Sequence, residues 1–126
     1  MSMKNYIPQF KTDEQAIECL NSLAFETVRA DVPELLEWVQ DLHWDSAHGV
    51  AKYLVPHVHE IQEELLDILK TNDEIWKFNI IKVLIAKSPN KLGPELMSMI
   101  RRIADHPTKA EKEEDVDVAA SEIIYK

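Results

Sequence analysis

A seven-residue pattern that occurs three times constrains the fold of this chain more than any other feature. The copies are residues 33–39 (PELLEWV), 63–69 (EELLDIL) and 94–100 (PELMSMI). Each copy is followed by a turn and a second segment of helical periodicity, at residues 45–55, 73–87 and 108–124. A two-helix unit repeated at this spacing is typical of helical solenoids, in which stacked pairs share a core that one pair alone cannot bury. Any two amphipathic helices look somewhat alike, but three copies at nearly constant spacing favour a true repeat.

The second segment of the middle repeat, residues 73–88 (DEIWKFNIIKVLIAKS), is apolar around most of its circumference. Two adjacent stripes at helical spacing carry this character: Phe78, Ile81 and Ile85, and beside them Trp76, Ile80 and Leu84. A helix of this kind has to be covered on more than one side. We therefore predict that it is the central and most buried helix.

The rest of the chain reads as amphipathic helices joined by short loops. Only two glycines, no hairpin dipeptide and no long period-two alternation occur, so the prediction is all-α. Capping boxes are expected at Thr12 with Gln15 and at Thr108 with Glu111, and the second opens one helix to about Ile124. A short helical turn is expected at 25–30. Further helices are expected from Pro33, with Asp31 as a cap, from Asp45, from His57 or Val58, from the cap Asp73, and from Pro94. The period is closest to short HEAT-like repeats. We expect one domain over residues 1–126, a HEAT-like alpha-alpha solenoid of about three helix pairs with an N-terminal capping helix.

Three stretches also carry a resemblance to a known family. They are PELLEWVQDLHW (residues 33–44), DEIWKF (73–78) and HPTKAEKEEDVDVAASEI (106–123). Over nearly its whole length the chain resembles a group of small bacterial proteins of unknown function with a HEAT-like helical-repeat fold. The resemblance implies the fold, and it brings no established activity and no catalytic residues.

Composition narrows the classes of partner. The formal net charge is −9, which disfavours nucleic acid because phosphate binding needs a basic face, and which suits a basic protein partner. The single cysteine, Cys19, cannot form an intrachain disulfide and falls among apolar residues, so we expect a small core residue. No stretch reaches the ~20 apolar residues of a membrane span, and the N-terminus has no signal-peptide run. These features predict a cytoplasmic protein without a membrane segment.

In HEAT-like stacks the second helices of successive repeats line a concave surface. Aromatic and polar or basic residues of those helices are the candidate partner-binding groove: Trp44, His48, Lys52, Trp76, Asn79 and Lys82. Tryptophans and long cationic chains supply much of the energy of interfaces. The alternative is that both tryptophans are core residues that close the turns between helices, and that the lysines are solvated.

Three histidines offer a metal- or small-ligand-binding alternative, namely His48, His57 and His59. Residues two apart on a helix point about 200° apart, so His57 and His59 bind one ion only if Pro56 keeps the segment extended. No zinc signature accompanies them, and we predict neither a metal nor a cofactor. The acidic run from Glu111 to Asp115, with Asp117, is either a solvated face or a docking edge for a basic partner.

No enzymatic signature is present. The serines have no glycine-flanked elbow, and two separated glycines cannot build a phosphate-binding loop. We therefore expect no enzyme. The expected role is that of a scaffold or adaptor that binds another protein. A more specific hypothesis is an immunity-type protein that binds a basic partner. The expected oligomeric state is a monomer or weak dimer.

Overall fold

The computed structural model describes residues 5–125, and every regular element in that range is a helix or helical turn. The α-helices are α1 (Glu14–Asn21), α2 (Phe25–Val28), α3 (Val32–Glu37), α4 (Asp45–Leu54), α5 (Gln62–Leu69), α6 (Glu74–Ile80), α7 (Pro94–Asp105), α8 (Lys109–Glu113) and α9 (Val116–Ile124). Short 3-10 segments are η1 (Arg29–Asp31), η2 (Trp38–Gln40) and η3 (Val55–Glu60), and η4 (Ile81–Ile85) is a π-helical turn. The predicted all-α class is confirmed. No helix among the described residues is long and apolar enough to cross a membrane.

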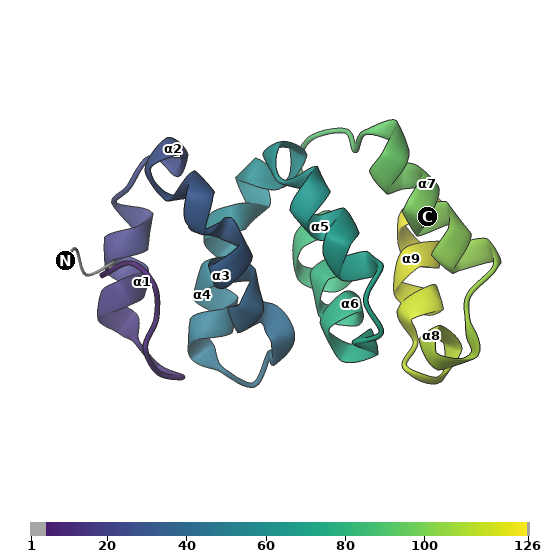
Figure 1. Ribbon diagram of the computed structural model, residues 1–126, viewed down its shortest axis with the longest axis horizontal. Coiled ribbons are helices and arrows are strands. Elements are labelled where there is room, and N and C mark those ends of the chain that lie inside the picture. Colours follow the sequence, from purple (N-terminus) through teal and green to yellow (C-terminus); the bar gives the residue numbers. More distant parts are fainter. Residues whose placement is uncertain (1–4, 126) are drawn as a thin grey trace.

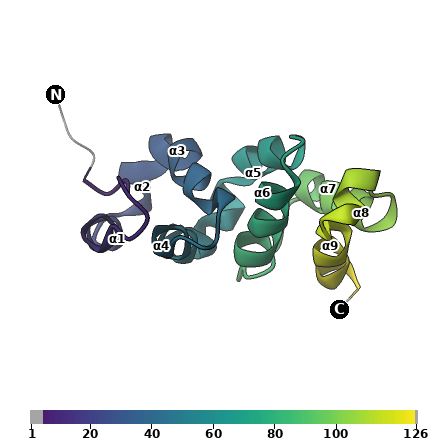
Figure 2. The ribbon, with the colours of Figure 1, turned by 90° about the horizontal axis from the view of Figure 1, so that it is seen from below.

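Groups of neighbouring helices follow one another along the long axis of the molecule, from α1 at one end to α7, α8 and α9 at the other (Figure 1). The view from below separates two layers, with α3 and α5 in one and α1, α4, α6 and α9 in the other (Figure 2). Each copy of the seven-residue pattern begins in the first helix of a pair, α3, α5 or α7, and a second helix follows it. The repeat seen in the sequence is thus a repeat of paired helices.

Equivalent positions of the three copies build the core. The third position of each copy is a fully buried leucine, at Leu35, Leu65 and Leu96. The seventh position is buried to the same degree, at Val39, Leu69 and Ile100. All six belong to one apolar cluster that runs through the described chain. Each such side chain contributes about 2 kcal/mol of hydrophobic free energy, so the repeated pattern supplies a large part of the stability.

The middle second helix is covered by elements from both sides, as predicted. Helix α6 contacts η2, α5 and α9, and η4 contacts α4, η3 and α9. Asp73 caps the helix, because its side-chain oxygen accepts a hydrogen bond from the backbone N–H of Trp76 at 3.1 Å. Coverage is incomplete at the first turn, where Ile75 is 57% exposed. The π-helical turn was not expected: the N–H of Ala86 donates to the carbonyl of Ile81, five residues earlier, at 2.9 Å.

Several helix boundaries differ from the prediction. Asp13, and not Thr12, caps α1, with its carboxylate accepting from the N–H of Ala16 at 3.2 Å. The expected helix from residue 57 or 58 starts only at Gln62, because the 3-10 segment η3 occupies residues 55–60, with Pro56 in its first turn. The expected single C-terminal helix is two helices, since Asp115 adopts a left-handed conformation with φ 59°. Aspartate tolerates this conformation better than most residues, which is why the break occurs there.

Candidate functional site

Two of the residues predicted to line a binding groove point into the protein instead. Asn79 is 5% exposed, and its side-chain amide donates to the carbonyls of Val39 at 2.9 Å and Gln40 at 3.2 Å. The indole N–H of Trp76 donates to the carbonyl of Leu36 at 3.0 Å. Both side chains donate to carbonyls at the end of α3 and in η2, and the carbonyl of Leu36 also accepts from a backbone N–H at the C-cap of α3. The expectation that Asn79 faces an open groove is therefore corrected: it joins α6 to the other layer.

The other predicted groove residues are Trp44, His48, Lys52 and Lys82, and three of them have partners outside this set. The ring of Trp44 packs edge-on against that of Trp38, with centroids 5.4 Å apart. His48 and Lys52 are exposed on α4, and a ring nitrogen of His48 lies 2.6 Å from the carbonyl of Leu42. Lys82 is occupied by an ion pair to α9, with its ammonium 3.2 Å from the Glu122 carboxylate. Of the six predicted groove residues, His48 and Lys52 are thus exposed, whereas Trp44, Trp76 and Lys82 are only partly exposed.

The three histidines of the ligand-binding alternative have separate partners. The ring of His57 stacks on Phe25 with centroids 4.3 Å apart, and its Nδ1 lies 2.9 Å from Glu60. His59 is 3.0 Å from the side-chain amide of Asn90. Within residues 5–125 no group of three or more histidine, cysteine or acidic side chains could hold a metal ion. The described chain therefore offers no metal centre built on these histidines.

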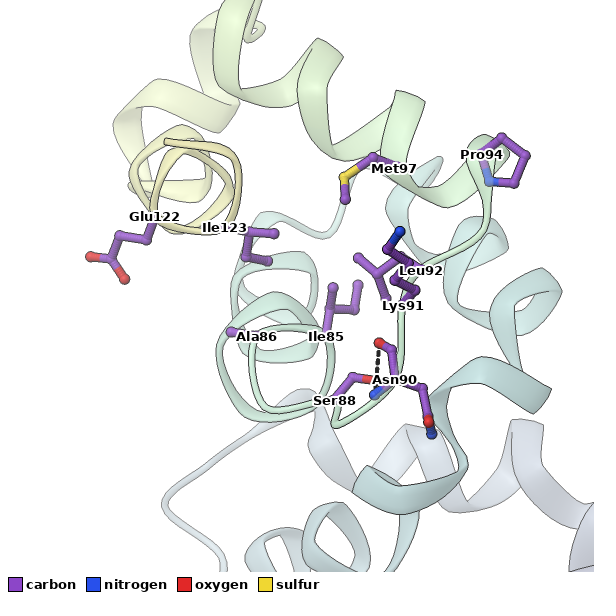
Figure 3. Close-up of a pocket in the computed structure, with 10 residues that line it drawn as sticks. All are labelled: Ile85, Ala86, Ser88, Asn90, Lys91, Leu92, Pro94, Met97, Glu122 and Ile123. Carbon is purple, nitrogen blue, oxygen red and sulfur yellow. Dashed lines mark hydrogen bonds between the residues drawn. The ribbon is translucent and has the colours of Figure 1, made fainter. Parts of the chain in front are cut away.

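A groove of about 710 Å³ lies between η4, the loop at residues 88–92, α7 and α9. We call it the α7/α9 groove. Its lining residues are Ile85, Ala86, Ser88, Asn90, Lys91, Leu92, Pro94, Met97, Glu122 and Ile123. In Figure 3, the side chains of Ile85, Leu92, Met97 and Ile123 gather around the opening, whereas Glu122 points away from it. The groove thus has an apolar interior, to which η4, the loop, α7 and α9 each contribute one of these side chains, and a polar rim.

The loop that forms one wall of the groove is fixed by its own hydrogen bonds. The hydroxyl of Ser88 accepts from the N–H of Asn90 at 3.3 Å and donates to the carbonyl of the same residue at 3.1 Å (Figure 3). The contact of Asn90 with His59 ties the loop to η3. Gln62 accepts from the N–H of Gly93 at 2.6 Å and holds the far end of the loop against α5. The wall is preformed, so binding in the groove does not have to order it.

A second hollow, of about 220 Å³, lies between α3 and α5. We call it the α3/α5 notch, and it is lined by Pro33, Leu36, Glu64, Asp67, Ile68, Thr71 and Trp76. Leu36 and Ile68 form an apolar floor with the partly buried indole of Trp76. Glu64 carries an ion pair to Arg29 at the edge. Asp67 is exposed, and its side chain makes no hydrogen bond or ion pair within the described residues, whereas its backbone carbonyl accepts from the N–H of Lys70. The notch combines an apolar floor with an acidic rim.

A buried ionic cluster joins α6, α7 and α8, and sequence reasoning missed it. Glu111 is 0% exposed and accepts from both terminal nitrogens of Arg102, at 2.6 and 3.1 Å, and from Lys77 at 2.7 Å. It also closes the predicted capping box, accepting from the N–H of Thr108 at 2.8 Å. Lys77 is itself buried and lies 2.9 Å from Glu74. The capping-box pattern was the one signal in the sequence that this glutamate faces inward.

The electrostatics of this cluster favour the charged form of the glutamate. Burial alone would raise the pKa of Glu111, but the hydrogen bonds from Arg102 and Lys77 and the N–H of Thr108 outweigh it and lower the pKa to about 2. The expected acidic patch is accordingly corrected in part. Glu111 is buried, whereas residues 112–115 are exposed. This cluster holds α6, α7 and α8 together, and its charges are used within the protein.

Comparison with known proteins agrees with the predicted resemblance to a family of unknown function. No curated protein matches the chain. A family described as "Domain of unknown function (DUF5071)" matches residues 6–124, which is nearly the whole sequence. The chain belongs to this family.

Proposed function

We propose that this protein is a small protein-binding module, and that its three helix pairs form a short HEAT-like solenoid. The support for the solenoid is the repeat itself, since equivalent leucines of the three copies share one core and the first and second helices separate into layers (Figure 2). Stacked pairs of this kind present extended, preformed surfaces. Such surfaces bind partners with little cost of ordering.

The observation that carries the proposal is the α7/α9 groove. Its interior is apolar, through Ile85, Met97 and Ile123, and its rim carries Lys91 and Ser88. An apolar centre with a polar rim is the general anatomy of a protein interface. The occupant that fits is an amphipathic segment of a partner protein, whose apolar side chains lie against the three groove residues. Carboxylates on its polar side would pair with Lys91.

The overall negative charge of the protein favours a partner that is basic. A net charge of −9 attracts a basic protein and speeds its encounter. An immunity-type protein, which neutralises a basic toxin by covering it, would use charge in this way, and so would an adaptor for a basic protein. The groove would then supply apolar contact while the acidic surfaces of the other helices steer the partner.

Site-specific crosslinking tests the proposal. A photo-crosslinking amino acid replaces Met97 in the groove, and a matched variant carries it at Glu18, which is exposed on α1 at the other end of the molecule. After illumination in lysate of the source organism, we expect a discrete protein adduct from position 97 that is absent from position 18. Met97→Glu should abolish capture of that protein by the otherwise native chain, and Lys52→Glu, on α4, should not. Adducts from both positions alike, or no loss with Met97→Glu, would place the interface elsewhere.

A further inference from the structure

The two helices that flank the α3/α5 notch carry an unusual excess of negative charge. Helix α3 contributes two glutamates, and α5 contributes two glutamates and one aspartate: Glu34, Glu37, Glu63, Glu64 and Asp67. Neither helix contains a lysine or arginine. Like charges at this density repel one another, and a bound cation relieves that repulsion. The notch is the point on this surface where charge and an apolar hollow meet.

An arginine of the protein itself already binds at one edge of the notch. The two terminal nitrogens of Arg29 face the two oxygens of Glu64 in a paired, fork-like arrangement, with Nη2 3.3 Å from Oε1. This pairing shows that a guanidinium fits beside α5 in an orientation that planar carboxylate recognition requires. Asp67 lies one helical turn further along the same helix and has no such partner among residues 5–125. One acidic position of the notch is therefore used, and the next is open.

The floor of the notch suits the uncharged part of a long basic side chain. Leu36, Ile68 and Trp76 line it, and the stem of an arginine or lysine packs well on such a surface while its charged end stays in water. An indole ring is also the aromatic surface that attracts a cation most strongly. The volume of about 220 Å³ accommodates one long side chain, and it is too small for a helix or an extended segment.

We propose that the α3/α5 notch binds a basic side chain, preferentially arginine, presented by a protein partner. The stem lies on Leu36 and Ile68 against Trp76, and the guanidinium pairs with Asp67. Arginine is favoured over lysine because its planar fork matches a carboxylate and stacks on an aromatic ring. Arginines that pack their stems in interface pockets are common hot spots.

This inference rests on the proposed protein-binding role, but it concerns a different surface. The notch is lined by α3, α5 and the start of α6, and none of its residues lines the α7/α9 groove. Binding of a defined peptide at Trp76 would support the notch proposal even if the α7/α9 groove captured no partner. Conversely, capture at position 97 says nothing about the notch, so the two proposals fail separately.

The experiment is an NMR titration of the isotope-labelled protein at low salt. The indole N–H signal of Trp76, assigned by its loss in Trp76→Phe, reports on the notch because this group donates to the carbonyl of Leu36. The probe is a short capped peptide of sequence Gly-Leu-Arg-Leu-Gly, and the matched probe replaces its arginine by neutral citrulline. We expect a saturable shift of the Trp76 signal with the arginine peptide and a much weaker one with citrulline. Added salt should reduce the affinity.

Variants of single charges complete the test. Asp67→Asn should weaken binding about fivefold, the upper range for an exposed ion pair. Glu95→Gln removes an equal charge from the exposed surface of α7 and should leave the affinity unchanged. Equal binding of the citrulline peptide, or equal weakening by both variants, would overturn the proposal in favour of non-specific contact or diffuse attraction. A shift of Trp76 with free spermidine at the same concentrations would overturn it in favour of a small amine.

Discussion

Replacement of Glu111 by glutamine should destabilise the protein strongly and in a pH-dependent way. The variant keeps the size of the side chain and removes the charge that faces Arg102 and Lys77. Loss of one partner from a buried pair costs about 3–5 kcal/mol, and Lys77 retains Glu74, so we expect the lower end, about 3 kcal/mol at pH 7. Urea unfolding followed by circular dichroism measures this difference. The control is Glu113→Gln, on the same helix but exposed, which should change the unfolding free energy by less than about 0.5 kcal/mol.

The pH dependence follows from the direction of the pKa shift. The pKa of Glu111 falls from an ordinary 4.5 to about 2 in the folded protein, so the unfolded chain binds its proton first as the pH drops. At face value this shift is worth about 3 kcal/mol, and screening at Arg102, whose side chain is 39% exposed, reduces it to about 2 kcal/mol. The stabilisation is complete above pH 4.5 and is lost as the pH falls toward 2. The difference between wild type and Glu111→Gln should therefore shrink across this window, because glutamine mimics the protonated acid.

Two results would refute this reasoning about the buried cluster. If Glu111→Gln were as stable as Glu113→Gln at pH 7, the buried charges would contribute nothing beyond packing. If the difference between wild type and Glu111→Gln stayed constant from pH 5 to pH 2.5, the carboxylate would not be the titrating group. Comparing the two proteins at each pH cancels the contribution of the other acidic residues, which titrate in both.

Three further substitutions test local features of the fold. Asn79→Ala should cost about 1–3 kcal/mol in urea unfolding, because it removes the donor to the buried carbonyl of Val39 and to the partly buried carbonyl of Gln40; a loss below about 0.5 kcal/mol would mean that water replaces the amide. Asp115→Gly should raise the unfolding free energy by up to about 1 kcal/mol, since glycine adopts a positive φ without strain. Unchanged or reduced stability would contradict the left-handed conformation of Asp115 between α8 and α9. Gly49→Ala should lower the melting temperature despite the better helix propensity of alanine, because the new Cβ would lie 2.8–2.9 Å from Cδ1, Cγ1 and Cγ2 of Ile17. Ile17→Ala removes all three atoms, so Gly49→Ala should cost less in an Ile17→Ala background than in the wild type; an equal loss in both backgrounds would exclude the steric explanation.

Periodicity and local capping rules were enough to predict the all-α class, most of the helices and the coverage of residues 73–88 from both sides. The cap at Asp73 and the capping box of Thr108 and Glu111 were also predicted, because both depend on residues close in sequence. The cap of α1 was wrongly predicted, because local rules do not distinguish between two adjacent residues that can both cap a helix. Thr12 and Asp13 are both good caps, and the hydrogen bond from the N–H of Asp13 to Ser46 on a distant helix favours the second.

The candidate binding residues were less predictable because their environment is set by distant helices. A helical wheel places Asn79 on a polar stripe, but it does not show that the end of η2 covers that stripe and accepts its amide hydrogens. Lys77 and Glu111 are far apart in sequence, so no spacing rule pairs them. The α3/α5 notch likewise depends on how two non-adjacent helices face each other across Trp76. Charge composition pointed to a basic partner, but it could not say which face carries the acids.

The π-helical turn η4 sets how the side chains of the second helix in the middle repeat are rotated relative to the loop that follows it. The repeat that starts at residue 63 is one residue longer than the repeat that starts at residue 33, and a π turn accommodates one residue more than an α turn. Deleting one residue within Ile81–Ile85 would return the helix to α geometry and rotate each preceding side chain by about 100° relative to the loop that follows. The same deletion would turn Lys82 away from Glu122 and remove Ile85 from the wall of the α7/α9 groove. A single extra residue in this turn thus decides which side chains of η4 face α9 and the α7/α9 groove.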